Sequence, residues 1–417
     1  MKGLNISKGA GKLVRRCVDV RTVCIALEVD PDASEKLHQT RRLYGQACEM
    51  LVPLIVADKE RRERLWQRFN LHKAGYRMVR NRLPDLGSQL ACNVMRSVSG
   101  AYQSWISNHP KFAKDKEMEL PSIRFRNPVI HLDKNTIRFF HHHTEATIYT
   151  ADGRVRVRLR PGRYQQSLLA GFLTEEITEK AKENRIYKLG ECNLVWRCGI
   201  KGTPSRWELH IAVEKKLKEV SLEDLKLDEV MGVDVGENNV AALSTGRIFK
   251  AGKMKDDRDK YLSSRARLQR NGSRSAKQAL RKASGRERRH VEQVNDEISK
   301  SIIGDAVHSQ TRLIVLEDLT NIRQRIKAGQ KVRARLHRWT FRELQQKIAD
   351  KAARAGIEVM FVDPHYTSKT CPRCNAIGTR RKHRFVCNTC GYRAHSDLNG
   401  GRNLQRLGYL LIARGLV

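Results

Sequence analysis

Four cysteines near the carboxyl end have the spacing of a metal site. Cys371 and Cys374 form one C-x2-C pair, Cys387 and Cys390 form a second, and a basic loop separates them. Each C-x2-C turn presents two thiolates on one side, so two such turns complete a tetrahedron around Zn²⁺. Four thiolates leave no position for water or substrate, and the sequence therefore predicts a structural zinc site. A redox role of the thioredoxin kind would need only one pair.

Three acidic residues stand where apolar elements end. Asp234 ends a valine-rich strand in MGVDVGENN, Glu317 ends another in LIVLED, and Asp397 begins the last expected helix. Burying an acid is costly unless a cation or a partner neutralises it. One such acid is often only a helix cap, which is how we interpret Asp318. Three of them predict a shared site, because neighbouring strands and the final helix can bring the carboxylates together.

Carboxylates with open coordination positions suit hard cations that keep bound waters, such as Mg²⁺ or Mn²⁺. Two such ions about 3.5–4 Å apart can activate water and stabilise the leaving oxygen of a phosphodiester. The elements around the acids run strand, strand, strand, helices, strand, helix, strand, helix. This order predicts an RNase H-like nuclease core, with the cysteines inserted between its last strand and its last helix.

The second half of the chain contains the elements that would position these residues. Residues 229–252 predict three short strands, and residues 254–307 predict a basic helical hairpin that turns near Gly272. A buried strand over 313–316 precedes a helix over about 339–355, which ends at Gly356 and leads into another buried strand. The last helix runs from about Asp397 to Ala413.

The first half predicts a different arrangement. Residues 16–29 predict a strand, and residues 34–106 predict helices broken near Asn70–Gly75 and Leu83–Gly87. From residue 121 the pattern changes to strands and turns. A hairpin signal at Asp152-Gly153 belongs to this part, which indicates a barrel or a curved sheet.

The net charge limits the choice of partners. Lys and Arg total 81 and Asp and Glu total 45, so the 417-residue chain carries a formal charge of +36. Such a surplus repels itself unless a polyanion neutralises it, and nucleic acid is the usual one. A basic protein of the ribosomal type and a protein bound to an anionic membrane are the alternatives. No apolar stretch is long enough to span a bilayer, and the amino terminus has no secretory pattern.

His383 and His395 are near enough in sequence to be alternative ligands of the zinc ion, but four cysteines already suffice. Cysteines and histidines elsewhere do not predict further metal sites. His141-His142-His143 would alternate between the two faces of a strand, so they cannot easily share one ion. Without an export signal, a disulfide framework is not expected, and we interpret the other six cysteines as buried thiols. They are Cys17, Cys24, Cys48, Cys92, Cys192 and Cys198.

Basic residues on a strand and on the hairpin are candidates for contacts with nucleic acid. Arg154, Arg156 and Arg158 alternate with Val and Leu in RVRVRLR, so one face can pack while the other presents positive charge. A merely solvated face is the competing interpretation, and the net charge favours the first. Arg265 and Arg281 are the candidates on the helical hairpin.

The helix expected over 88–106 supplies candidates for reading a short nucleic-acid motif. Leu90, Val94 and Val98 fall on one helical face, which leaves Asn93 and Arg96 facing away from the core. An ordinary helix of a helical bundle is the alternative.

Three segments resemble the RuvC motifs and the zinc ribbon of the TnpB family. They are GVDVGENNVAALSTG, LIVLEDLTNI and HYTSKTCPRC…CNTCGYRAHSDLNGGRNL. TnpB proteins are transposon-encoded, RNA-guided DNA nucleases from which compact type V CRISPR effectors descend. The specific signal covers about residues 229–404, and the amino-terminal half agrees in layout only.

The resemblance implies an α+β multidomain fold. A helical recognition domain interrupts a β-barrel wedge domain, and an RNase H-like (RuvC) α/β nuclease domain with an inserted zinc ribbon follows. The implied boundaries are 1–30 and 120–228 for the wedge, 31–119 for recognition, 229–364 and 396–417 for RuvC, and 365–395 for the ribbon.

Residue by residue, the resemblance makes Asp234, Glu317 and Asp397 the catalytic, magnesium-binding acids, and the four cysteines of the C-x2-C pairs the zinc ligands. Asn399 and Asn403 lie in DLNGGRN. Gly400-Gly401 stands there in place of the usual alanines, and we expect this pair to soften the start of the last helix.

The implied activity is RNA-guided cleavage of DNA beside a short motif, by one RuvC site that uses Mg²⁺ or Mn²⁺. The implied partners are a guide RNA and target DNA, both double-stranded and single-stranded, bound by a monomer or by a homodimer on one guide RNA. The expected location is the prokaryotic cytoplasm, with action at the nucleoid and no membrane partner. A guided DNA-binding protein that blocks without cutting and a strand-joining transposase are the alternatives, and the ribbon before Asp397 disfavours the latter.

Overall fold

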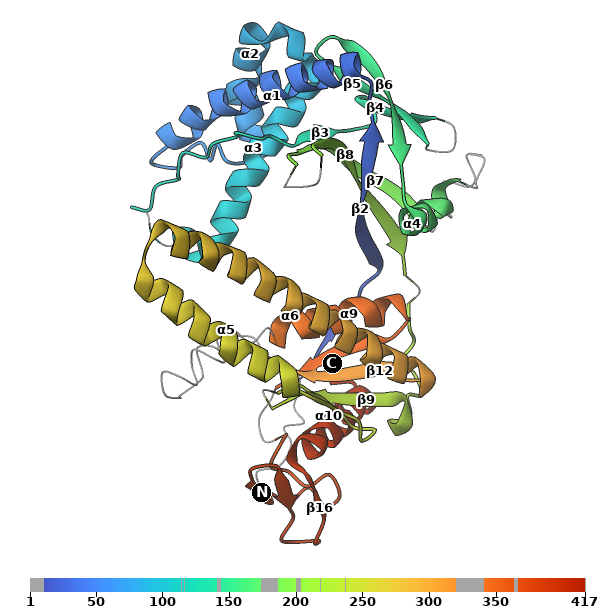
Figure 1. Cartoon of the computed structure of the whole chain (residues 1–417). Coiled ribbons are helices and arrows are strands. Elements are labelled where there is room, and N and C mark those ends of the chain that lie inside the picture. Colours follow the sequence, from blue (N-terminus) through green and yellow to red (C-terminus); the bar gives the residue numbers. More distant parts are fainter. Residues whose placement is uncertain are drawn as a thin grey trace. The chain divides into compact units, whose positions relative to one another are not determined.

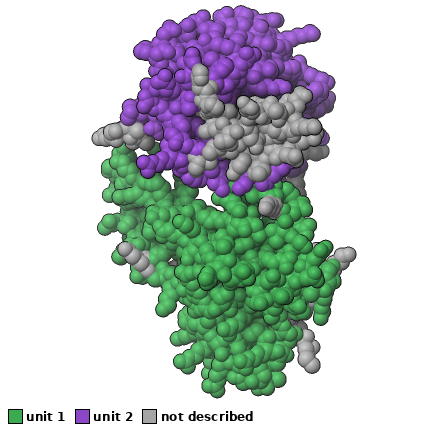
Figure 2. Space-filling model, turned by 90° about the vertical axis from the view of Figure 1, so that its right-hand side faces the viewer, with its two compact units in different colours: residues 1–19, 217–417 green, residues 20–216 purple. Residues whose placement is uncertain are grey.

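The computed structural model describes residues 11–113, 115, 117–140, 144–173, 187–199, 204–217, 219–236, 238–319, 341–363 and 367–416. The three consecutive histidines, 141–143, lie outside these residues. The α+β class is confirmed (Figure 1). The chain forms two compact units, residues 20–216 and residues 1–19 with 217–417 (Figure 2). None of the described helices is both long enough and apolar enough to cross a membrane.

The unit of residues 20–216 is built on a seven-stranded sheet that curls into a nearly closed barrel, with strand order β3-β7-β8-β2-β6-β5-β4. In β6, Val155, Val157 and Leu159 are buried and the arginines between them are exposed. The expected hairpin turn forms at Gly153, where φ is 78°. The strands are β2 (Val18–Glu28), β3 (Ile130–Leu132), β4 (Ile137–Phe140), β5 (Glu145–Thr150), β6 (Gly153–Arg160), β7 (Tyr187–Arg197) and β8 (Arg206–Lys216).

Three helices lie between β2 and β3 in the chain: α1 (Pro31–Ala57), α2 (Arg68–Arg82) and α3 (Ser88–Asn108). Asp30 caps α1, since its carboxylate accepts from the backbone N–H of Ala33 over 2.9 Å. Short 3-10 turns follow α2 and α3, at η1 (Pro84–Leu86) and η2 (Pro110–Ala113). The sequence did not predict a further helix, α4 (Arg163–Leu173), which follows β6.

The expected helix break at Leu83–Gly87 is confirmed, but the one near Asn70–Gly75 is wrong. Those residues lie inside α2, and the chain leaves the helix over residues 58–67 instead. Gly75 serves helix packing, because a Cβ there would lie 2.3 Å from Cδ2 of Leu51 on α1. A glycine that permits close approach was thus interpreted as one that ends a helix.

All ten cysteines are free thiols, but of the six outside the C-x2-C pairs, which we expected to be buried, only two are buried and Cys92 is half-buried. Cys48 and Cys192 are buried, whereas Cys17, Cys24 and Cys198 are exposed. Strand alternation explains Cys24, because its neighbours on β2 at positions 23 and 25 point into the core.

The second unit contains a six-stranded sheet in the order β1-β13-β12-β9-β10-β11. The adjacent strands β13, β12 and β9 are parallel and almost wholly buried, as strands covered on both faces should be. The other pairings are antiparallel. The strands are β1 (Gly11–Val14), β9 (Val230–Asp234), β10 (Asn239–Leu243), β11 (Ile248–Lys250), β12 (Leu313–Glu317) and β13 (Glu358–Val362).

Helices cover both faces of this sheet (Figure 1). On one face, Leu404 and Leu411 of α10 (Ser396–Ala413) pack in a cluster with Val315 of β12. On the other, Ile302 of α6 (Arg274–His308) and Ile348 of α9 (Phe341–Arg354) pack in a second cluster. The sheet is therefore the middle layer of three.

The predicted basic hairpin is confirmed. α5 (Gly252–Asn271) ends at Gly272, which adopts φ 65°, and α6 begins directly after Ser273. The hydroxyl of Ser273 caps α6 by accepting from the backbone N–H of Ala276 over 3.1 Å. Gly356, at φ 72°, likewise follows α9 as expected.

A small three-stranded sheet lies between β13 and α10 in the chain. Its strands are β14 (Thr379–Arg381), β15 (Arg384–Val386) and β16 (Arg393–His395), in that order. Phe385 is fully buried and packs in a cluster with Cys371 and Cys387. Because this core is so small, the sheet needs another source of stability, which a metal ion can provide.

Candidate active site and metal centre

The three acids predicted to converge line one hollow of about 780 Å³. Asp234 ends β9 and Glu317 ends β12, and these neighbouring parallel strands finish at the same edge of the sheet. Asp397 lies in the first turn of α10. The structure thus brings the three carboxylates together, as the sequence indicated, and their catalytic role stays a prediction.

Repulsion and burial mark these acids as a site for a cation. Burial, followed by the charges of Glu317 and Asp397, raises the pKa of Asp234 well above its usual value. Burial also raises the pKa of Glu317, Asp363 adds to the rise, and the hydrogen bond from Thr367 opposes it. A divalent cation would remove the repulsion, and carboxylate oxygens are the ligands that Mg²⁺ and Mn²⁺ prefer. The donor set therefore fits a hard divalent ion.

Asp397 is held from several sides. Asn239 donates from Nδ2 to Oδ2 over 2.8 Å, and the Ser396 hydroxyl donates to Oδ1 over 3.0 Å. Arg380 of the small sheet forms an ion pair with Oδ1 at 3.4 Å. Sequence analysis did not single out Asn239. The signal was a polar residue at the start of a buried strand, in the same motif as Asp234.

Glu317 is also fixed by neighbours that the sequence did not reveal. The hydroxyl of Thr367 donates to its Oε1. Gln345 of α9 donates from Nε2 to its backbone carbonyl over 2.8 Å. These contacts orient the carboxylate before any ligand arrives.

Glycines allow α10 to lie directly against the acid-bearing strand. A Cβ on Gly232 of β9 would lie 1.9 Å from the carbonyl oxygen of Gly401. A Cβ on Gly400 would lie 2.6 Å from Oδ2 of Asp234. α10 is helical from Ser396, and the expected softening of its start by the glycine pair stays a prediction. The pair leaves room for the carboxylate.

The four cysteines form a compact thiol cluster. One Sγ atom from each lies within 4.8 Å of the others, with 3.6 Å between Cys371 and Cys390 and 3.4 Å between Cys374 and Cys387. Four thiolates bound to Zn²⁺ at about 2.3 Å would be roughly 3.8 Å apart. The backbone N–H groups of Cys390 and Thr389 help to lower the pKa of Cys387 to about 6. Geometry and chemistry both fit a closed Zn²⁺ site.

Two buried asparagines connect this cluster to α10. Asn399 donates from Nδ2 to the carbonyls of Thr370 and Ser368, over 2.9 and 3.4 Å. Asn403 donates to the carbonyls of Thr370 and Thr367, over 2.6 and 2.7 Å. We call Asn399 and Asn403 the asparagine latch. The latch fastens the segment that leads into Cys371 to the helix that carries Asp397.

Comparisons with known proteins identify relatives of the chain. Residues 341–404, which include the cysteines and Asp397, match the family model described as Cas12f1-like, TNB domain. A TnpB-like protein of Methanocaldococcus jannaschii is 32% identical over 190 residues, which are 42% of this chain and 68% of the relative. The chain belongs to the TnpB-like family.

Two further likenesses extend the comparison. The CRISPR-associated endodeoxyribonuclease Cas12f1 of Sulfoacidibacillus thermotolerans is 32% identical over 221 residues, 48% of this chain and 50% of that protein. The chain thus spans only half the length of this relative. A Cas12f1 chain solved by cryo-EM with sgRNA and target DNA superimposes with a TM-score of 0.62 at 13% identity, covering 94% of this chain and 99% of that one. This last likeness shows the fold alone.

In this TnpB-like chain, the predicted arginine row lies on the exposed face of β6. Part of its charge is matched by acids, since Arg156 bonds Glu145 over 2.6 Å and Arg158 lies 3.6 Å from the same carboxylate. Arg154 donates to the backbone carbonyl of Asn135 over 2.5 Å. The strand-face prediction is confirmed, and contact with nucleic acid stays a prediction.

The other candidates for nucleic-acid contact differ in exposure. Arg281 is exposed and Arg265 half-buried on the helical hairpin. Arg96 forms an ion pair with Glu191. The expectation that Asn93 faces away from the core is wrong.

Asn93 is only 3% exposed, and it donates from Nδ2 to the carbonyl of His131 over 2.9 Å. The sheet that packs on α3 covers more of the helix than one apolar stripe indicates. In this conformation the side chain of Asn93 makes a contact inside the protein. Its role in recognising a short nucleic-acid motif stays a prediction.

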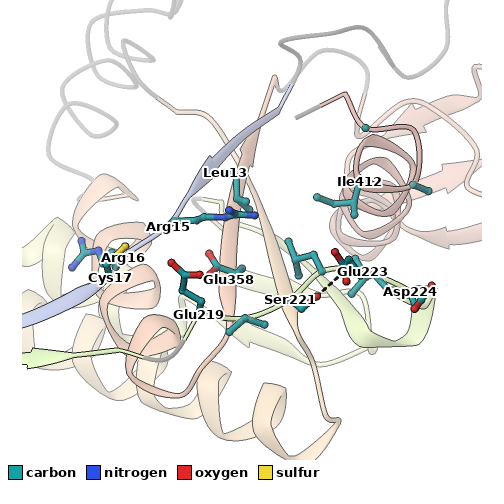
Figure 3. A pocket seen from close by; sticks show the side chains of 15 residues that line it. Leu13, Arg15, Arg16, Cys17, Glu219, Ser221, Glu223, Asp224, Glu358 and Ile412 are labelled. Atoms are coloured by element: carbon teal, nitrogen blue, oxygen red, sulfur yellow. Dashed lines mark hydrogen bonds between the residues drawn. The ribbon is translucent and has the colours of Figure 1, made fainter. Parts of the chain in front are cut away.

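A second hollow of about 790 Å³ lies in the same unit as the acids (Figure 3). Glu219 and Glu358 lie side by side in it, and Arg15 and Arg16 supply the opposite charge. Burial raises the pKa of Glu358, with Arg15 opposing and Glu219 adding to the rise. Four acids, Glu219, Glu223, Asp224 and Glu358, and two arginines, Arg15 and Arg16, line this hollow, so its acids outnumber its cations.

Proposed function

We propose that the chain is an RNA-guided DNA endonuclease that cuts with one site formed by Asp234, Glu317 and Asp397. The observation that carries the proposal is the convergence of these acids, from three separate segments, in one hollow. The membership in the TnpB-like family and a relative named as a CRISPR-associated endodeoxyribonuclease support it. The charge of +36 supports nucleic acid as the partner.

The domain assignment is part of the proposal. Residues 1–30 and 120–228, which include the barrel strands β2 to β8, act as a wedge domain, and the helices of residues 31–119 act as the recognition domain. Residues 229–364 and 396–417 form a RuvC nuclease domain, into which residues 365–395 insert a zinc ribbon. The α10 helix that returns to the six-stranded sheet supports this connection between the last two parts.

The three carboxylates would hold two Mg²⁺ or Mn²⁺ ions, which would supply an activated water and stabilise charge on the phosphodiester. The contribution of the chain is to fix the ligands in place. Thr367 orients Glu317, and Asn239 orients Asp397. Arg380, now paired with Asp397, can reach negative charge that develops on a phosphate at the same place.

The four cysteines would hold Zn²⁺ and take no part in the reaction, since four thiolates close the coordination sphere. Their effect on cleavage would pass through the asparagine latch to α10 and Asp397. Zinc is therefore proposed as a structural ion, separate from the magnesium site.

Guide RNA and target DNA would lie against the basic faces, including the arginine row of β6 and the α5–α6 hairpin. Base pairing with the guide would supply sequence specificity, while protein contacts read only a short adjacent motif. Opening of the duplex would expose the single strand that is cut.

The test uses the protein as purified with its bound RNA. That RNA is sequenced, and a duplex matching its variable end, with randomised flanks, is the substrate. We expect Mg²⁺-dependent cleavage by the wild type, none by Asp234→Asn, and equal RNA retention by both. Asp228→Asn, an exposed acid in the same unit, is the matched control.

Undiminished cleavage by Asp234→Asn would overturn the site assignment. Guide-dependent retention of DNA by the wild type, with no cleavage at any Mg²⁺ or Mn²⁺ concentration, would replace the nuclease with a guided DNA-binding protein.

A further inference from the structure

A second cluster of metal ligands lies at the edge of the candidate active site. His383 lies in the turn between β14 and β15, His395 ends β16, and Asp397 follows two positions later. One ligand atom from each lies within 4.8 Å of the other two. The centres of the two imidazole rings are 5.4 Å apart. The four cysteines form a different group, so this cluster is not part of the predicted zinc ribbon site.

We propose that His383, His395 and Asp397 bind a transition-metal ion of the Zn²⁺, Co²⁺ or Ni²⁺ class. Imidazole suits these ions, whereas Mg²⁺ prefers carboxylates, carbonyls and water. Two imidazoles bound to one tetrahedral ion through bonds of about 2.0 Å have ring centres roughly 5 Å apart. The observed separation is 5.4 Å and the ring planes lie 19° apart, so the imidazoles must rotate for their nitrogens to meet at one ion.

The fold places the ligands without help from an ion. In the β15–β16 ladder, Arg384 lies opposite His395, so His383 occupies the adjacent position on the same edge. The carbonyl of His383 accepts from the backbone N–H of Ser396 over 2.9 Å. The turn that carries His383 is therefore tied to the start of α10.

His395 is held by a contact that a metal can replace. Its Nδ1 accepts from the backbone N–H of Asp397 over 3.3 Å, a long hydrogen bond at the helix start. Coordination would exchange this bond for a metal bond. The neighbouring cations Arg380 and Lys382 are outnumbered by the three acids of the hollow, so the local charge still favours a cation.

Three protein ligands leave a coordination position for water or a phosphate oxygen. Asp397 would be common to this site and to the proposed magnesium site. An ion on the histidines would therefore compete for a carboxylate that cleavage needs and would inhibit it. This consequence depends on the proposed function, but the binding itself does not.

The test measures binding of Co²⁺ to the whole protein, with its cysteine cluster already loaded with zinc. We expect one additional Co²⁺ per chain, with weak visible bands typical of nitrogen and oxygen ligands and no sulfur charge-transfer band. His383→Ala should weaken binding at least about tenfold, since even supporting residues of metal sites have effects of this size. His308→Ala, which removes an exposed histidine outside the cluster, should not.

His383→Ala is the main variant because His395→Ala also removes a helix cap. Asp397→Asn should weaken Co²⁺ binding as well. The proposal is overturned if no Co²⁺ binds beyond the cysteine cluster, or if His383→Ala binds it as tightly as the wild type.

A cleavage measurement then tests the inhibition. Micromolar Zn²⁺ added to a Mg²⁺ reaction should slow the wild type, and His383→Ala should be at least about tenfold less sensitive relative to its own zinc-free rate. Equal sensitivity would overturn inhibition through this site. Absence of cleavage under all conditions would contradict the proposed function and leave the Co²⁺ result intact.

Discussion

Asn403 donates a 2.6 Å hydrogen bond to the backbone carbonyl of Thr370, which ties the helix carrying Asp397 to the segment that enters the cysteine cluster. Asn399 donates to the same carbonyl from one helical turn earlier. Both asparagines are fully buried. The asparagine latch thus connects cluster and helix through a carbonyl that two donors share, beside Arg406 of α10, which donates to the carbonyl of Pro372 over 3.0 Å.

Asn403→Ala should therefore loosen this connection. The carbonyls of Thr367 and Thr370 would lose a donor in a buried place, which costs about 1–3 kcal/mol. We expect a lower unfolding temperature, retained zinc and slower DNA cleavage. Asn388→Ala, on the exposed side of the cysteine module, is the control. Wild-type stability of Asn403→Ala would show that the latch contributes nothing.

Removal of zinc should also loosen the connection between the cysteine cluster and α10, because it destabilises the cluster itself. Cys374→Ser, or a strong chelator, should release zinc, lower thermal stability and slow cleavage while Asp397 remains in the chain. The small core around Phe385 cannot hold the sheet alone. Cys198→Ser, an exposed thiol outside the cluster, should keep both zinc and activity. Full cleavage by protein shown to contain no zinc would contradict a structural role.

The positions of Asp234 and Glu317 could be predicted because each ends a strand whose other residues are buried. A short apolar run with an acid at its end is a local signal. Parallel pairing then brings the strand ends together, and α10 adds Asp397. The C-x2-C spacing is also a local sequence signal, so the cysteine cluster could be predicted as well.

Contacts between distant segments could not be predicted from such local patterns. Asn239 bonds Asp397 from 158 positions away, and nothing near Asn239 indicates that partner. Asn93 was placed by helical periodicity, which reports a single apolar stripe and not the strand that covers its flank. Gly75 shows the same limit, since ending a helix and admitting a neighbouring helix require the same small residue.

Two glycines in the unit of residues 1–19 and 217–417 should respond oppositely to the same substitution. Gly232→Ala would place a Cβ 1.9 Å from the Gly401 carbonyl and force α10 away from β9, which costs about 1–3 kcal/mol. Gly304→Ala, inside α6 with no atom within 4 Å of the new Cβ, should gain about 0.5–1 kcal/mol. Thermal unfolding of both variants checks the contrast. Equal effects would mean that α10 does not pack this closely.

The barrel unit should lose stability in acid through Glu208. Burial alone would raise its pKa, but hydrogen bonds from His210, Arg197 and Arg206 outweigh burial and lower the pKa from 4.5 to about 2. The native state thus binds this proton less readily than the unfolded chain does. The stability that the Glu208 carboxylate adds to the folded state is complete above about pH 4.5 and is lost as the pH falls toward 2.

Glu208→Gln removes the titrating group while keeping its shape. We expect lower stability at pH 7 and a flatter decline between pH 4.5 and 2 than in the wild type. Tryptophan fluorescence can follow the transition, because Trp196 and Trp207 lie in the same barrel. Glu60→Gln, an exposed glutamate of the same unit, should keep the wild-type slope. An unchanged acid slope in Glu208→Gln would show that its ion pairs do not stabilise the barrel.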